Sequence, residues 1–181
     1  MNEKTRILCR TALLLALAVI SQFFKNTSVY ITGPIVNCIL LIAVLSCGLA
    51  SAAALAFITP ITSWLITGNP VMSAMPVIPF CIMGGNFLLV LCTWLFVRKK
   101  DANLNLIFGT VAGSVAKAAF MAVTIVLLVL QLLGPASGLP EAALTAAKTT
   151  FSVTQLITSL IGSALAVLIW QVLKKALRQP Q

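Results

Sequence analysis

The sequence is poor in charge and contains no histidine. Only 8% of its 181 residues are charged, whereas a soluble domain carries roughly 25%. The acids number three in all, Glu3, Asp101 and Glu141, and each lies in a tail or a loop between apolar stretches. If this chain folded in water, its contiguous exposed apolar surface would far exceed the limit that soluble monomers tolerate, which is about a few hundred Å². Composition therefore excludes a soluble globular protein.

The same absences limit the chemistry of the chain. With no histidine and no acid inside an apolar segment, general acid–base catalysis, metal catalysis and proton relays lack their usual residues. The cysteines form no CxxC pair, and we interpret them as small apolar residues rather than zinc ligands. We therefore predict that the chain is not an enzyme and has no metal site and no cofactor. The cysteines are Cys9, Cys38, Cys47, Cys81 and Cys92.

What is abundant is long apolar sequence. Hydrophobic residues make up 60% of the chain, and its mean hydropathy is +1.10. A transmembrane helix needs about 17 to 25 mostly apolar residues. Turns are expected at Gly33-Pro34 and at Ser46-Cys47-Gly48, which leaves the second span short. The sequence predicts an all-α polytopic membrane protein with one six-helix domain over residues 1–181, and its approximate spans are residues 7–24, 35–45, 49–66, 80–97, 106–133 and 150–173.

The net charge of +9 is explained by topology. Nucleic-acid binders spread Lys and Arg along a face, whereas here the bases flank apolar runs, where they face lipid head groups, so no nucleic-acid partner is expected. In the six-span arrangement, both termini lie on one side of the membrane, and Lys25 and Lys148 are the only loop bases on the opposite side. The positive-inside rule therefore predicts that both termini are cytoplasmic. The cytoplasmic bases would be Lys4, Arg6, Arg10, Arg98, Lys99, Lys100, Lys174, Lys175 and Arg178.

One ionisable residue, Lys117, lies inside a predicted span. A charge at such depth costs about 2.5 to 3.5 kcal/mol on insertion scales, so it usually faces a cavity or a partner. The alternative is a structural lysine that snorkels or bonds a backbone carbonyl. Uncharged polar and aromatic residues reach similar depth, and together with Lys117 they predict a pocket for a small ligand with a carboxylate or phosphate. These candidates are Asn37, Asn86, Trp64, Gln155 and Thr158.

Ala12 and Ala16 are four residues apart in the first span, near its basic end. Small residues at this spacing allow two helices to approach closely. They predict either internal packing or an interface with a partner helix.

Taken together, these features resemble the substrate-binding S component of an energy-coupling factor (ECF) transporter. The resemblance covers nearly the whole chain and rests on its length, on six spans with both ends inside, on Ala12-x-x-x-Ala16, and on the segments ITGPIVN (residues 31–37), ITPIT (58–62) and MPVIPFCIMGGN (75–86).

The resemblance implies several functional properties. It implies that helices one to three dock on a transmembrane coupling subunit, that two ATPases drive uptake, and that a vitamin or similar micronutrient binds in an outward cavity. It also implies a multi-pass protein of a prokaryotic plasma membrane, in contact with lipids. The lack of acids in the spans disfavours cationic substrates such as thiamine. Two other classes stay open, an autonomous facilitator and a non-transport scaffold.

The topology can be tested by cysteine labelling on a background without the native cysteines. Residues 98–103 are expected in the cytoplasm and residues 134–145 outside, because of the asymmetry of the basic residues. A membrane-impermeant thiol reagent applied to intact cells should therefore label a cysteine at position 138 and spare one at position 101. The reverse pattern would overturn this topology.

Overall fold

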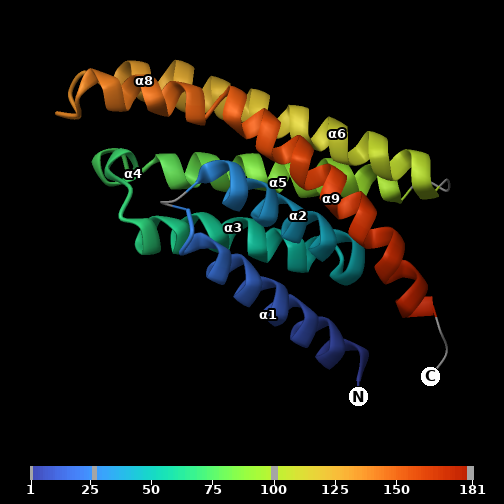
Figure 1. Ribbon diagram of the computed structural model, residues 1–181. Helices are drawn as coiled ribbons and strands as arrows, with labels where there is room; N and C mark the ends of the chain where they lie inside the picture. Colours follow the sequence, from blue (N-terminus) through green and yellow to red (C-terminus); the bar gives the residue numbers. More distant parts are fainter. Residues whose placement is uncertain (1, 26–27, 99–101, 179–181) are drawn as a thin grey trace.

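We describe residues 2–25, 28–98 and 102–178 of a computed structural model of the chain, in which all regular structure is helical (Figure 1). The order of elements is α1 (Glu3–Gln22), α2 (Val29–Cys47), α3 (Leu49–Thr67), α4 (Pro70–Ala74), α5 (Ile78–Val97), α6 (Ala102–Met121), the π-helical stretch η1 (Ala122–Val129), α7 (Leu130–Leu132), α8 (Glu141–Thr150) and α9 (Val153–Arg178).

Six helical segments are long and apolar enough to cross a membrane, which confirms the predicted fold class. Large apolar side chains such as Leu13, Leu65 and Phe80 point outward, whereas Asn37, Lys117 and many hydroxyls are buried. This distribution is the one that a lipid environment favours, because hydrocarbon solvates apolar surface and leaves polar groups to satisfy one another inside the bundle.

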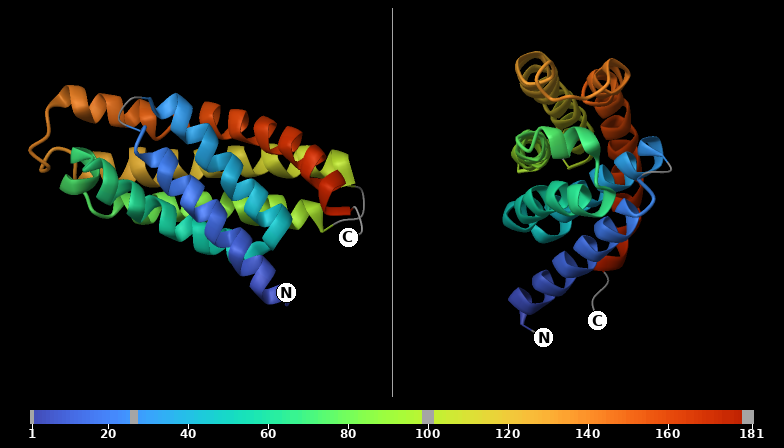
Figure 2. Two further views of the ribbon diagram at one scale, coloured as in Figure 1. Left: turned by 60° about the horizontal axis from the view of Figure 1, so that its bottom comes forward. Right: turned by 90° about the vertical axis from the view of Figure 1, so that its left-hand side faces the viewer.

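The start of α1 and the end of α9 lie at the same end of the bundle, away from α4 (Figures 1 and 2). An even number of crossings produces this arrangement. The end of the bundle that contains α4 and the start of α8 is called the α4 end below.

The turn expected at Gly33-Pro34 is wrong, because α2 begins at Val29 and includes Pro34. A proline this close to a helix start removes one backbone hydrogen bond, and a helix within a membrane tolerates it because irregular backbone would leave more groups unpaired. Gly33 instead allows close packing: a Cβ there would lie 2.9 Å from Cβ of Thr158 on α9. The second span therefore runs from Val29 to Cys47, long enough for a full crossing.

The other boundaries differ from expectation in smaller ways. The turn expected at residues 46–48 is made by Gly48 alone, whose φ of +88° favours glycine. The segment expected to be a loop before the last span contains α8. Its sequence, EAALTAAKTT, is rich in good helix formers but too polar to resemble a span.

Two apolar clusters lie on either side of the middle of the bundle, one toward the termini and one toward the α4 end. The first cluster, toward the termini, contains Leu40 and Leu41 of α2, Leu55 of α3, and Leu89 and Val90 of α5. The second cluster lies at the α4 end and is built from α4, α5, η1, α8 and the residues around them. Its most buried members are Met72, Met75, Ile78, Met121 and Ile125. The polar residues of the candidate site lie between the two clusters.

Candidate functional site

Glycines bring α5 and α6 into close contact around the site. A Cβ at Gly85 would lie 2.8 Å from Cγ of Met121 and 3.5 Å from Cγ of Lys117, and one at Gly113 would lie 2.7 Å from the carbonyl oxygen of Leu89. At Gly113 the neighbour is backbone and cannot move aside, so this position requires glycine, whereas at Gly85 a larger residue would displace the Met121 side chain. Because Asn86 follows Gly85 directly, the close approach of the two helices also brings its amide to the Lys117 side chain.

Lys117 is 3% exposed, and its ammonium group bonds to two amides. Nζ donates to Oδ1 of Asn37 on α2 at 2.6 Å and to Oδ1 of Asn86 on α5 at 2.7 Å. An ammonium group only donates, so both amides must turn their oxygens toward it. Among the contacts of the described residues, two of its three N–H groups are used, which leaves one for an acceptor in the cavity.

Lys25, just beyond the end of α1, brings a second ammonium group to the same site. Its Nζ donates to Oγ of Ser63 on α3 at 2.5 Å. Nearby, Nε2 of Gln22 donates to the carbonyl oxygen of Thr59 at 3.0 Å, which fixes the end of α1 against α3. Burial lowers the pKa of Lys25 from its usual 10.5 to about 8, because an enclosed ammonium group loses hydration.

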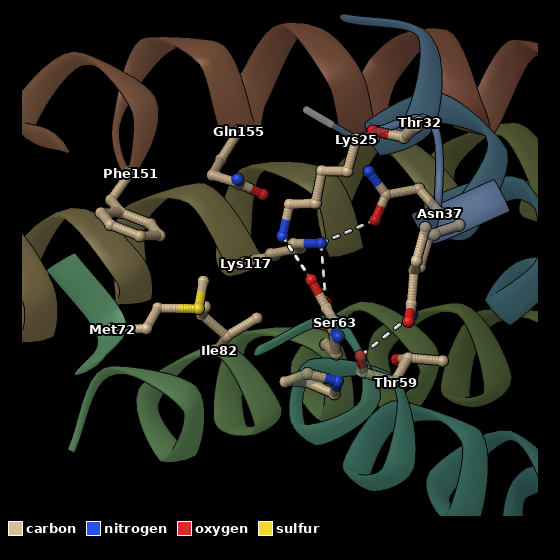
Figure 3. Close-up of a pocket in the computed structure, with 15 residues that line it drawn as sticks. Lys25, Thr32, Asn37, Thr59, Ser63, Met72, Ile82, Lys117, Phe151 and Gln155 are labelled. Carbon is tan, nitrogen blue, oxygen red and sulfur yellow. Dashed lines mark hydrogen bonds between the residues drawn. The ribbon is translucent and has the colours of Figure 1, made fainter. Parts of the chain in front are cut away.

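These side chains line a cavity of about 80 Å³ (Figure 3). Lys25, Lys117 and Gln155 point into it on one side, and Met72, Ile82 and Phe151 form an apolar wall on the other. The described lining contains no carboxylate, histidine or thiol, and its charged groups are the two lysines, which can bind an anion. The lining residues are Gln22, Lys25, Thr32, Gly33, Val36, Asn37, Thr59, Pro60, Ser63, Met72, Ile82, Asn86, Lys117, Phe151 and Gln155.

Of the six residues predicted to bind substrate, four line this cavity: Lys117, Asn86, Asn37 and Gln155. The other two, Trp64 and Thr158, lie outside the lining. The Trp64 indole N–H donates to Oγ of Ser73 in α4 at 3.2 Å. The Thr158 hydroxyl donates to the carbonyl oxygen of Thr154 within its own helix at 2.8 Å. Substrate contact stays a prediction for all six.

Sequence reasoning missed Lys25 as a site residue and assigned it only to topology. One signal was available: Lys25 is one of two bases on its predicted side of the membrane, and it directly follows an apolar run. The apolar wall had no such signal. Met72, Ile82 and Phe151 come from three separate segments of an apolar chain, and only the fold brings them together.

The bundle and its cavity define a class of protein: a polytopic membrane protein with a polar cavity that two lysines line. A family model described as "ECF transporter, substrate-specific component" matches residues 6–173. The chain belongs to this family of substrate-binding transporter subunits, and membership implies a small substrate and partnership with coupling and ATPase subunits. A search of curated proteins and a search of solved structures each found no match.

The Lys117 contacts predict a coupled effect on stability. Asn86→Leu should lower the thermal unfolding midpoint in detergent, because loss of one acceptor from a buried charge costs about 1 to 3 kcal/mol. Adding Lys117→Met should restore most of that loss, since the group that needed the acceptor is then gone.

Gln155→Leu is the control, because it changes a cavity amide that is not one of the two acceptors of Lys117. If the changes that Asn86→Leu and Lys117→Met make to the thermal unfolding midpoint simply add in the double variant, the two side chains act independently. That result would contradict the coupling.

Proposed function

We propose that this chain binds a small anionic micronutrient in the cavity of Lys117 and delivers it to the cytoplasm with a transmembrane coupling subunit and two ATPases. The observation that carries the proposal is the buried ammonium group of Lys117, which has amide acceptors but no carboxylate in the described cavity lining. A ligand with a carboxylate or phosphate supplies the missing negative charge.

The side of the membrane from which the ligand is proposed to enter follows from the loop charges and from the position of the cavity. Lys25 and Lys148 are the two bases assigned to the outer side, and Lys25 lines the cavity. The positive-inside rule therefore favours a cavity that is loaded from outside the cell, at the α4 end of the bundle. The prokaryotic plasma membrane is the proposed location.

α1 is the proposed docking face for the coupling subunit. It is the least buried of the six spans: 17% of an 18-residue apolar window is buried in α1, against 56% in α2. Ala12 and Ala16 are both exposed on it. This exposure favours a partner interface over internal packing as the reason for their spacing, because exposed small residues leave room for another helix.

The ligand can be tested by mass spectrometry of small molecules that copurify with the detergent-solubilised protein. Wild-type protein should retain a small anion, and Lys117→Met should bind that anion at least tenfold more weakly, about 1.4 kcal/mol. Folding should survive, because the substitution removes a buried charge and keeps most of the stem. Unchanged binding in a well-folded Lys117→Met protein would leave Lys117 a structural residue.

Coupling can be tested with Ala12→Trp and Ala16→Trp. Each should abolish uptake in cells while purified protein still binds its ligand, since bulk on the exposed face of α1 blocks docking far from the cavity. Loss of binding together with a lower melting temperature would instead indicate internal packing. Uptake that persists in cells without any coupling subunit and ATPases would contradict the proposed mechanism.

A further inference from the structure

The cavity contains two lysines from separate elements that approach one another. Lys25 follows α1 and Lys117 lies on α6, yet their ammonium groups point into the same space and repel each other (Figure 3). We propose that one compact anionic group of the ligand, a carboxylate or a phosphate, bridges Lys25 and Lys117. This inference rests on the proposed function and adds Lys25 as a second ligand-binding residue.

The argument for a bridging anion is charge balance. The described residues that line the cavity include these two cations and no acid. Each ammonium group is held by neutral oxygens: Asn37 and Asn86 hold Lys117, and Ser63 holds Lys25. Neutral acceptors orient the two charges but do not neutralise them. An anion between them removes the repulsion and adds charge-assisted hydrogen bonds, which are about twice as strong as neutral ones.

The rest of the cavity indicates the shape of such a ligand. Met72, Ile82 and Phe151 face the lysines from the other side of the cavity and offer no hydrogen bonds from their side chains. An apolar group attached to the anion would bury its surface against them. The cavity therefore suits a short amphiphilic anion, with its charged head at Lys25 and Lys117 and its apolar end at this wall.

This arrangement gives ligand binding a defined pH dependence. Lys117 on α6 is the single charged group that faces Lys25 among the described lining residues, since the lining side chains of α2, α3, α5 and α9 are uncharged. The pKa of Lys25 is lowered to about 8 without ligand, and a bound anion raises it. Binding is therefore strongest below pH 8, where Lys25 carries its proton, and weakens as the pH rises above 8.

The test uses three probes that share a short alkyl chain: butanoate, butyl phosphate and butan-1-ol. Their Kd values are measured by calorimetric titration of the full chain in detergent. We expect one or both anions to bind and the alcohol to bind at least tenfold more weakly. The tighter anion identifies carboxylate or phosphate as the natural head group. Equal binding of the alcohol and the anions, or no binding of either anion, would overturn the proposal.

Three variants show whether Lys25 takes part. Lys25→Met should raise the Kd of the better anion at least tenfold, and Lys25→Arg should restore binding. Lys148→Met is the matched control, because it removes an exposed charge from α8, outside the cavity, and should leave the Kd unchanged. If Lys25→Met binds as wild type does while Lys117→Met binds weakly, the two-lysine site is wrong and the proposed function stands.

The pH dependence gives an independent readout with butanoate, whose carboxylate stays ionised throughout. Its Kd for the wild-type protein should rise about tenfold between pH 7 and pH 9, as a group of pKa about 8 loses its proton. In Lys25→Arg this weakening should be smaller, because the guanidinium group stays charged. An identical rise in both proteins would contradict a role for Lys25.

Discussion

The structure depends on the need to satisfy one buried charge. An ammonium group within the bundle, away from water, is stable only with acceptors around it, and lipid offers none. Lys117 on α6 obtains one acceptor from α2 and one from α5. Three spans, α2, α5 and α6, must therefore keep a common register at this depth. A shift of one helix by a turn, about 5.4 Å, would separate the groups and leave the charge unpaired.

Glycines make this register possible. In a membrane, helices associate through close packing rather than the hydrophobic effect, so small residues decide where two backbones can meet. Gly85 and Gly113 bring α5 and α6 together, and a Cβ at Gly162 on α9 would lie 2.7 Å from Cβ of Asn37. Gly85 and Gly162 thus lie beside Asn86 and Asn37, the two residues that bind Lys117. Packing and polar contacts specify the same arrangement, which is how a chain with few charges defines a single site.

Hydropathy was enough to predict the fold class, because a span is a property of local composition. The same signal failed at Pro34 and at α8: a proline near a helix start and a polar helix both resemble loops when only local residues are considered. For the site, the cost of burial singled out Lys117 as soon as it was placed in a span. Lys25 was not singled out, since a lysine at the end of an apolar run has a simpler explanation in topology. Its part in the cavity depends on how α1 packs against α3, which no local pattern contains.

The position of the cavity also bears on how such a protein transports. On the side toward the termini, the first apolar cluster fills the space between α2, α3 and α5. The buried hydroxyls between α5, α6 and α9 are occupied: Thr93 donates to the carbonyl oxygen of Leu89 at 2.8 Å, and Ser114 and Ser163 are 2.9 Å apart. In the described chain, the polar lining of the cavity therefore does not continue through the bundle. A ligand held at Lys117 has no polar route onward through this subunit alone. In the proposed mechanism, release toward the other side requires a rearrangement that breaks this packing, and the coupling subunit proposed to dock on α1 drives it.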